Sequence, residues 1–346
     1  MVTRNDVARV AKVSPAVVSY VLNDSNYVSA EKREAVLKAV EELNYIPNQT
    51  ARSLKQNKTY QIAVLRGSAL NDMFNDLLFD MEGLAYEKGY TVSLMTIMRG
   101  EDLLTKESYI NTLISRKFDA IYVANSSLTE KQINRLVMAG IPVLLYTTRD
   151  YHGLDERVRY LAPDYRNGVK QLIDILIQLG HTRIAFAPNL FYPSIWGTSN
   201  HRFAGYVRAF EENGLTVPQK YICAEPDSME QIVNSVARLF DGKTADECPT
   251  AIYVDESIVA GSILQRLQGM GKRVPEDVSI VCSSDSTIAT LLQPRLTALG
   301  LAPHLLAEKA IDMLLAMMDG NSPESCLMKM ELRWRESIKD IRGLQR

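Results

Sequence analysis

The sequence predicts a small all-α helix-turn-helix head joined to an α/β body of two lobes, each built on a doubly wound parallel sheet. Three observations lead to this prediction. The first 46 residues combine helix-capping residues with apolar residues at helical spacing, whereas from Tyr60 short apolar runs alternate with longer amphipathic stretches. That alternating series then occurs twice, which indicates two similar βαβ halves. A length of 346 residues also suits two or three folding units better than one.

The first predicted helix follows Thr3, whose hydroxyl caps free backbone N–H groups, while Asp6 places an acid in the positive first turn. The pattern breaks at Lys12. The apolar residues between these points share one face of the helix and are Val7, Ala8 and Ala11.

A second helix is predicted to begin at Ser14, which caps it, and Pro15, whose fixed φ suits the first helical position. Its apolar residues share one face. The opposite face is the surface that meets a DNA major groove in helix-turn-helix proteins, with the N-terminal residues reaching base edges. The residues expected to contact DNA from this part of the chain are Thr3, Ser14, Pro15, Ala16, Ser19, Tyr20 and Asn23.

A third helix closes the head and ends at Asn44, which tolerates the left-handed conformation of a C-cap. A short helix over 49–55 is then expected, with Asn48 as its cap and with Ala51 and Leu54 on one side. A helix of about seven residues is marginal alone in water, so it orders only when something holds it.

The motifs of this region are T-x-N-D-V-A-x-x-A-x-V-S-x-x-x-V-S-x-V-L-N, then V-S-A, L-N-Y-I-P-N and A-R-S-L. In this order they resemble the N-terminus of the lactose and galactose repressor (LacI/GalR) family. The resemblance implies a sequence-specific DNA-binding regulator, expected to be a repressor, with a periplasmic-binding-protein-like body. It also implies that 49–55 is a hinge helix that pairs with its twin across a homodimer. Asn48, Ala51 and Leu54 would then contact DNA, with Leu54 entering the minor groove.

Two positions depart from the family pattern. The family usually has glycine where this chain has Lys12, so a backbone position that needs a positive φ would carry a strained lysine. The family often has arginine where this chain has Tyr20, and Pro15 and Ala16 offer no bidentate hydrogen bonds to bases. The operator sequence therefore does not follow from the resemblance. The residues alone leave open a surface helical hairpin that binds no nucleic acid, and a flexible linker in which Leu54 is incidental.

Charge and cysteine usage fit an intracellular DNA-binding protein. Residues 1–58 carry nine basic and six acidic side chains, whereas the remainder carries 30 basic and 35 acidic ones. A positive head suits phosphate contact, while the acidic body repels DNA. The four cysteines are widely spaced without a CxxC, which predicts neither a disulfide scaffold nor a metal site. No apolar run approaches a membrane span and no export signal is recognisable, so we expect a cytoplasmic protein without membrane contact.

The apolar runs of the body predict its strands. In the first series these are 62–65, 91–97, 118–124 and 141–146, and in the second they are 183–187, 221–224, 251–254 and 278–283. A strand at 296–299, a helix at 305–318 and an alternating run at 328–335 complete the chain.

The resemblance implies that the chain crosses between the lobes three times, near 162, 300 and 325. The expected domains are a helix-turn-helix DNA-binding domain over 1–46, a hinge over 47–59 and an effector-binding and dimerisation domain over 60–346. Within the last, the N-lobe is expected at about 60–161 and 300–325, and the C-lobe at about 162–299 and 326–346.

A small-molecule effector is expected in the cleft between the lobes, because ligands bind α/β sheets beyond the carboxyl ends of their strands. Arg202, in R-F-A-G-Y, matches the family motif R-x-x-G-[YWF], whose arginine typically hydrogen-bonds a ligand hydroxyl or carboxylate. Asp255 aligns with a family N-D pair, and Trp196 offers a flat face for a sugar ring. The expected effector-binding residues are Phe74, Thr147, Asp164, Trp196, Arg202, Asp255 and Ser284.

The effector is expected to be a carbohydrate, although this expectation depends partly on the resemblance. Thr147 and Ser284 stand where many members of the family have sugar-binding carboxylates. A phosphorylated, nucleoside or non-sugar ligand therefore remains an alternative.

Signatures of catalysis are missing from the sequence. It has no G-x-G-x-x-G, no GxxxxGK[ST], no HExxH and no GxSxG, and its four histidines lie apart. We therefore predict no catalytic residue, no cofactor and no metal. His181, in L-G-H-T-R-I, matches a recurrent family feature and is expected to be structural. The alternative function is a solute-binding module of a transport system, which would share the two-lobed body but not residues 1–58.

These observations together predict a ligand-controlled regulator that acts as a homodimer. Two heads would read two half-sites of a pseudo-palindromic double-stranded operator. The effector would change the angle between the lobes and so the pairing of the hinge helices. The C-terminal tail after Ser337 carries no leucine heptads, so a dimer is expected rather than a tetramer.

Overall fold

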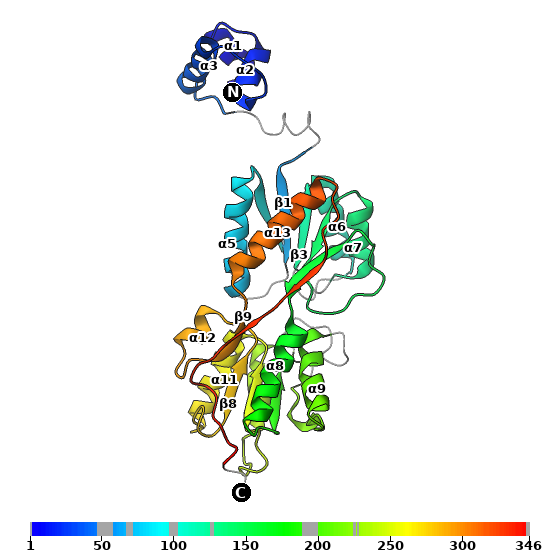
Figure 1. The fold of residues 1–346 in the computed structure, drawn as a ribbon, viewed down its shortest axis with the longest axis vertical. Helices are drawn as coiled ribbons and strands as arrows, with labels where there is room; N and C mark the ends of the chain where they lie inside the picture. Colours follow the sequence, from blue (N-terminus) through cyan, green and yellow to red (C-terminus); the bar gives the residue numbers. More distant parts are fainter. Residues whose placement is uncertain are drawn as a thin grey trace. The chain divides into compact units, whose positions relative to one another are not determined.

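The structure, shown in Figure 1, is a computed structural model of the 346-residue chain. It describes residues 2–46, 58–66, 72–96, 103–124, 128–188, 200–223, 226 and 228–343. The chain forms two compact units, residues 1–59 and 60–346. The expected hinge helix over 49–55 lies outside the described residues.

Unit 1 contains three helices, α1 (Arg4–Val10), α2 (Pro15–Asn23) and α3 (Ala30–Glu42). Thr3 and Asp6 form a capping box at the start of α1, and the hydroxyl of Ser14 accepts the N–H of Val17 at 3.3 Å at the start of α2. The helices enclose a small core of Val7, Ala8, Val18, Val21, Val36, Ala39 and Tyr45. The three helices predicted for the head and the N-caps predicted at Thr3 and Ser14 are therefore confirmed.

Two backbone positions of unit 1 have the left-handed conformation that the sequence indicated. Lys12, in the turn between α1 and α2, has φ 53°, and Asn44, after α3, has φ 46°. Asparagine tolerates this region through local hydrogen bonding, whereas lysine pays a steric cost there. The turn at Lys12 is therefore strained.

Unit 2 begins with the N-lobe, whose sheet has the strand order β10-β5-β4-β3-β1-β2. All its described pairings are parallel. Its strands are β1 (Gln61–Arg66), β2 (Thr91–Thr96), β3 (Ala120–Ala124), β4 (Val143–Leu145), β5 (Arg159–Pro163) and β10 (Cys326–Met328). Its helices are α5 (Asp72–Glu87), α6 (Leu103–Arg116), α7 (Glu130–Met138) and α13 (Pro303–Met318).

The C-lobe has a five-stranded sheet of order β11-β9-β8-β7-β6. Its strands are β6 (Ile184–Ala187), β7 (Ala251–Val254), β8 (Ser279–Cys282), β9 (Thr297–Gly300) and β11 (Glu331–Arg333). Its helices are α8 (Tyr165–Gln178), α9 (His201–Glu212), the 3₁₀ turn η1 (Gln219–Tyr221), α10 (Met229–Arg238), α11 (Ser257–Gly269) and α12 (Thr287–Leu291). Strand β11 pairs antiparallel with β9, so this sheet is mixed rather than wholly parallel.

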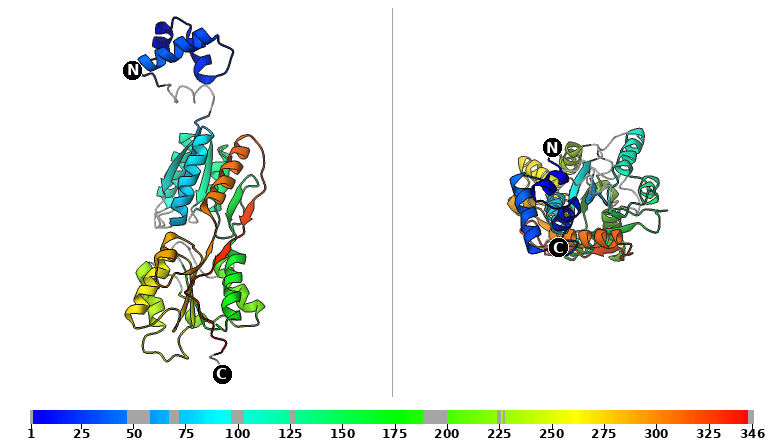
Figure 2. Two further views of the ribbon diagram at one scale, coloured as in Figure 1. Left: turned by 60° about the vertical axis from the view of Figure 1, so that its left-hand side comes forward. Right: turned by 90° about the horizontal axis from the view of Figure 1, so that it is seen from above.

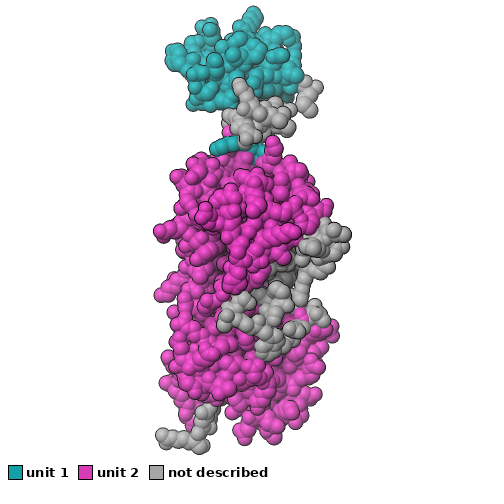
Figure 3. Space-filling model, turned by 90° about the vertical axis from the view of Figure 1, so that its right-hand side faces the viewer, with its two compact units in different colours: residues 1–59 teal, residues 60–346 magenta. Residues whose placement is uncertain are grey.

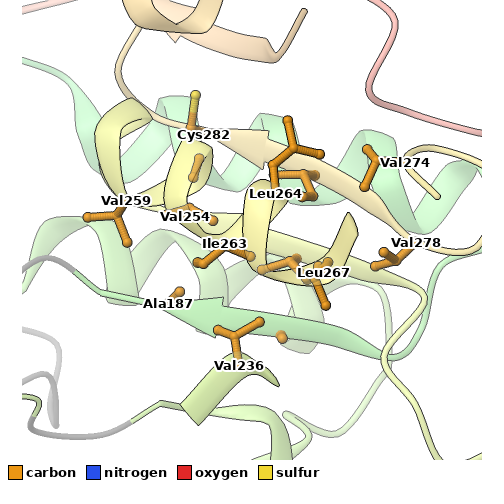
Figure 4. Close-up of a cluster of buried hydrophobic side chains, with 14 of the residues drawn as sticks. Ala187, Val236, Val254, Val259, Ile263, Leu264, Leu267, Val274, Val278 and Cys282 are labelled. Carbon is orange, nitrogen blue, oxygen red and sulfur yellow. The ribbon is translucent and has the colours of Figure 1, made fainter. Parts of the chain in front are cut away.

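Helices cover both faces of each sheet, as the apolar strands required. In the N-lobe, α5 and α13 share one buried cluster with the sheet, and α6 and α7 share the other (Figure 2). In the C-lobe, α8 and α9 cover one face and α10 and α11 the other. Figure 3 colours the two units separately. Figure 4 shows the cluster under α11, in which Ile263, Leu264 and Leu267 share a buried core with Val254 and Ala187.

The chain crosses between the lobes three times, and Figure 1 shows the three connections passing through one region. They lie between β5 and α8, between β9 and α13, and between β10 and β11. The third crossing comes later than expected. Cys326–Met328 was expected in the C-lobe but pairs with β5 in the N-lobe sheet, because Cys326 lies in register with Leu161.

Two further local expectations differ from the structure. The strand expected at 221–224 is a 3₁₀ turn followed by a single bridge between Ile222 and Phe186, so its apolar residues reach the core without a full strand. Strand β5 was not expected, because Arg159 and Tyr160 interrupt the apolar pattern at its exposed end.

Candidate nucleic-acid interface and effector site

Five of the predicted DNA-contacting residues of the head lie on one outer surface of α2. Pro15, Ala16, Tyr20 and Asn23 are exposed on α2, and Ser19 is half-buried beside them. Val18 and Val21, on the opposite face, are buried in the head core. The helix therefore presents a polar and small-residue surface at its N-terminal end, which is the geometry needed to enter a major groove.

Hydrogen bonds within the head fix several of the predicted DNA-contacting side chains. The side-chain amide of Asn23 donates to the backbone oxygen of Ser19 at 2.8 Å and to its hydroxyl at 3.2 Å. The hydroxyls of Thr3 and Ser14 accept backbone N–H groups at the starts of α1 and α2. Tyr20 is 38% exposed, so its ring is available to bases or sugars. Asn48, Ala51 and Leu54 lie outside the described residues.

In unit 2, Arg202 lies in the first turn of α9 and is only 2% exposed. Its Nε donates to the hydroxyl of Ser283 at 3.0 Å, and its Nη2 lies 3.9 Å from Oε1 of Glu256. Its guanidinium also stacks on the ring of Tyr165, 3.4 Å from the ring centroid. Arg202 is thus fixed by side chains from three other parts of the C-lobe.

The hydroxyl of Ser283 lies at the centre of the hydrogen bonds around Arg202. It accepts from Arg202 and from the hydroxyl of Tyr253 at 2.8 Å, and it donates to the backbone oxygen of Asp255 at 3.0 Å. It follows β8, just as Asp255 follows β7, so parallel strand ends bring these residues together. Sequence analysis singled out Ser284, but Ser283 is the residue that contacts Arg202.

Two carboxylates accompany Arg202 below the surface. Asp255 is fully buried and Glu256 is 7% exposed. Buried carboxylates are costly unless paired or hydrogen-bonded, and Arg202 supplies an opposite charge. The site therefore joins a guanidinium donor to carboxylate acceptors at the carboxyl ends of β7 and β8.

The structure does not bring the other predicted effector residues into this cluster. Phe74 is buried in the N-lobe core, where Arg66 lies over its ring at 5.3 Å. Thr147 forms a tight turn with Arg149. Asp164 caps α8 by accepting the backbone N–H and the side-chain amide of Asn167, and Ser284 is 8% exposed beside the cluster. Trp196 lies outside the described residues.

Contacts between the lobes were missed by sequence reasoning. The segment after β4 in the N-lobe meets the starts of α8 and α9 in the C-lobe. The hydroxyls of Tyr146 and Tyr165 are 2.9 Å apart, and Asp150 contacts both Arg166 and His201. Their spacing in sequence gives no signal, because the contacts depend on how the two lobes meet.

The comparisons with known proteins agree with this geometry. Residues 3–48 match the family described as bacterial regulatory proteins, lacI family, and residues 173–338 match a periplasmic binding protein-like domain. The HTH-type transcriptional repressor PurR of Vibrio vulnificus (strain CMCP6) is 30% identical over 347 residues, which cover 99% of this chain and 100% of that protein. The chain belongs to the LacI family. It is accordingly a DNA-binding transcriptional regulator with a ligand-binding body, and the match over the head disfavours the solute-binding alternative.

Other transcriptional regulators show similar agreement over nearly the whole chain. Catabolite control protein A of Priestia megaterium is 28% identical over 343 residues, with 98% of this chain and 99% of that protein covered. The structure of the lac repressor dimer bound to operator and the anti-inducer ONPF matches with a TM-score of 0.82 at 23% identity, covering 97% of this chain and 98% of that one. The complex of the transcriptional regulator CelR with cellobiose matches with a TM-score of 0.69 at 25% identity, covering 97% and 100%.

The described part of the chain has neither a membrane-spanning helix nor a metal-binding cluster. No helix in the described ranges is long and apolar enough to cross a membrane. No group of three or more His, Cys, Asp or Glu side chains among those same residues is placed to hold a metal ion.

Proposed function

We propose that this LacI-family regulator binds a carbohydrate effector against Arg202 at the boundary between its lobes, and that the effector controls its affinity for a pseudo-palindromic operator. The observation that carries the proposal is the buried cluster in which Arg202 is fixed beside Glu256, Asp255 and Ser283. The body binds this effector without converting it chemically. Because its target is operator DNA, the protein acts in the cytoplasm.

The cluster suits a polyhydroxylated ligand for a simple reason. A sugar hydroxyl both donates and accepts hydrogen bonds, so it is best served by a fixed guanidinium donor next to carboxylate acceptors. Arg202 and Glu256 provide that pair within 3.9 Å. The CelR structure, which contains cellobiose, supports a sugar as the ligand class.

Titration of the purified protein with a panel of mono- and disaccharides, sugar phosphates and purine bases tests the ligand class. We expect one of the neutral sugars to bind and to change operator affinity. Arg202→Ala should then weaken sugar binding by about a hundredfold, since a fixed charged hydrogen bond is lost. Arg208→Ala is the matched control, because Arg208 lies on the same helix α9 but is exposed and pairs with Glu212.

Two results would contradict this proposal. Unchanged sugar affinity in the Arg202→Ala protein would remove Arg202 from the site. Binding of purines or phosphates alone would replace the carbohydrate by another ligand class. Thermal unfolding of both variants checks that each is folded, and Arg202→Lys tests whether charge without the planar fork is sufficient.

The operator is tested by selecting bound DNA from a random pool. We expect a two-fold symmetric site, because two heads of a homodimer read equivalent half-sites. Tyr20→Ala should relax the selection at one or two base pairs of each half-site, whereas Leu37→Ala, an exposed position on α3, should leave the selected sequence unchanged. Enrichment of a single asymmetric half-site would contradict the binding of DNA by two equivalent heads of a homodimer.

The homodimer is proposed to form through the side of unit 2 that carries α5 and α12, which lie on the same side in Figure 1. Phe79 and Tyr86 on α5 are 78% and 77% exposed, and Leu291 on α12 is 74% exposed. Gly83 lies between the two aromatic residues, and a Cβ at this position would meet nothing within 4 Å. A mid-helix glycine costs helix stability, and here it allows a second backbone to approach closely.

A further inference from the structure

Asp150 connects the two lobes through a single carboxylate. It belongs to the segment after β4 in the N-lobe, while its partners Arg166 and His201 lie in the first turns of α8 and α9 in the C-lobe. We propose that Asp150, Arg166 and His201 form an ionic latch across the lobe boundary, which sets how readily the lobes separate and thereby regulates the effector site. The regulatory part of this inference rests on the proposed function.

The geometry gives each carboxylate oxygen its own partner. Oδ2 of Asp150 accepts from Nη2 of Arg166 at 2.7 Å, and Oδ1 lies 2.9 Å from Nε2 of His201. Both partners sit where helix N-termini carry positive partial charge, which adds to the attraction for a carboxylate. One N-lobe side chain is thus held by two helices of the C-lobe.

The latch is accompanied by backbone contacts across the same boundary. The N–H of His201 donates to the backbone oxygen of Thr148 at 3.1 Å, and Arg149 and Asn200 form an antiparallel bridge. Separation of the lobes along this edge must therefore break the backbone hydrogen bond of His201 together with its side-chain contact. The amide of His201 is consequently a direct reporter of the boundary.

The three side chains of the latch differ in burial. The side chain of His201 is 7% exposed, and those of Asp150 and Arg166 are 39% and 37% exposed. Partly buried pairs are screened less by water and salt than exposed pairs. The charged groups that face His201 are Asp150 from the N-lobe segment, Arg166 from α8 and its neighbour Arg202.

The ionisation states fit a closed latch at neutral pH. Burial alone would raise the pKa of Asp150, but hydrogen bonds from His201 and Arg166 outweigh it and hold that pKa below its usual value. Burial lowers the pKa of His201 despite the nearby carboxylate, so the imidazole is neutral and donates through Nε2. Acidification therefore favours the separated state, in which the imidazole is hydrated and takes up a proton more easily.

The latch and the proposed effector site share neighbouring residues of α9. His201 and Arg202 are consecutive residues at the start of α9, so a movement of that turn alters the lobe contact and the effector contact together. A ligand that binds Arg202 better in one lobe arrangement shifts the population toward that arrangement, and the latch sets the starting balance.

Amide hydrogen exchange of the full-length protein without ligand tests the latch. Asp150→Asn removes the charge at nearly constant shape. It should speed exchange of the His201 amide by about tenfold, as expected for the loss of a hydrogen bond to a charged group. Asp155→Asn is the matched control, because Asp155 pairs with Arg157 within the N-lobe. Exchange at β7, Ala251–Val254, should not change in either variant.

Two outcomes of the exchange experiment would overturn the latch. One is unchanged exchange of the His201 amide in Asp150→Asn. The other is a uniform increase that includes β7, which would mean that Asp150 stabilises the fold rather than the boundary. His201→Gln provides a second variant, with the expected increase read at Asn200 and Arg202.

The regulatory role is tested by the ratio of operator affinities with and without effector. Asp150→Asn should change this ratio by about tenfold relative to Asp155→Asn, in proportion to the shift in lobe balance. An unchanged ratio together with faster His201 exchange would overturn the regulatory role. Failure to find any operator or effector would instead contradict the proposed function, and it would leave the exchange result intact.

Discussion

The guanidinium of Arg202 lies over the ring of Tyr165, with its central carbon 3.4 Å from the ring centroid. The hydroxyl of Tyr165 is in turn 2.9 Å from that of Tyr146 in the other lobe. Burial raises the pKa of Tyr165, so this hydroxyl keeps its proton at neutral pH. The ring therefore positions the arginine of the proposed effector site, and its hydroxyl contributes to the lobe boundary.

The two roles of Tyr165 are separable by substitution. Tyr165→Leu removes the ring beneath Arg202 and should weaken effector binding by about tenfold, the size of a desolvated cation–π contact. Tyr165→Phe keeps the ring and removes only the hydroxyl, so effector affinity should stay within about twofold. Titration with the sugar that binds most tightly in the panel measures both. An equal loss in the two variants would show that the hydroxyl matters and the ring does not.

Sequence reasoning predicted the parts of the fold that depend on local pattern. The caps at Thr3 and Ser14, the left-handed turn at Lys12 and the βαβ order of both lobes follow from neighbouring residues, and the structure confirms them. Strand β5 was missed because Arg159 and Tyr160 interrupt its apolar pattern. The placement of Cys326–Met328 was missed because it depends on pairing with a strand more than 160 residues earlier in the chain. Local pattern carries no information about such pairing.

The sequence predicted those residues of the effector site that stand in recognisable motifs, but not those that are defined by contacts between distant segments. Arg202 and Asp255 were identified because each stands in a recognisable motif at a strand end or helix start. Ser283 was passed over for its neighbour Ser284, since sequence alone does not show which hydroxyl points inward. Asp150 was missed because its partners Arg166 and His201 lie in the other lobe, and only the way the lobes meet brings them together.

Lys12→Gly should stabilise the head. Lysine at φ 53° carries a steric cost of about 1 kcal/mol that glycine avoids. Glycine also raises the conformational entropy of the unfolded chain, which cancels part of this gain in stability. We expect amides of α1 and α2 in the full-length protein to exchange up to about fivefold more slowly. Lys38→Gly, in the exposed middle of α3, is the control and should speed exchange, because glycine weakens a helix interior. Faster exchange in Lys12→Gly would show that the turn is not strained.

Phe79→Asp should convert the dimer to a monomer. A charge at the centre of the proposed α5 contact would have to be buried without a partner, which costs several kcal/mol. Sedimentation velocity at micromolar concentration measures the change. Met138→Asp is the matched control, because Met138 is 71% exposed on α7, which covers the opposite face of the N-lobe sheet. Dissociation by Met138→Asp but not by Phe79→Asp would place the interface elsewhere.

His181 should make the stability of the C-lobe depend on pH. It is fully buried, and its Nε2 is 2.9 Å from the backbone oxygen of Lys339, which only accepts, so Nε2 carries the proton. Its Nδ1 then accepts from the hydroxyl of Thr250 at 3.0 Å. The folded state thus holds a neutral imidazole, and burial lowers its pKa. Stability from this residue is present above the unfolded pKa of about 6.5 and is lost as the pH falls below it.

His181→Gln tests that dependence. At pH 7.5 the variant should be less stable by about 2 kcal/mol, because a buried hydrogen bond is lost or distorted. Toward pH 5 the difference in stability between the two proteins should narrow. The unfolded wild-type chain then binds a proton at His181, whereas the folded protein holds this imidazole neutral, so the wild-type protein loses stability. Calorimetric unfolding temperatures of both proteins between pH 5 and 8 measure the two slopes. Because His201 titrates equally in both, the difference between the slopes belongs to His181, and parallel slopes would mean that His181 does not change its proton affinity on folding.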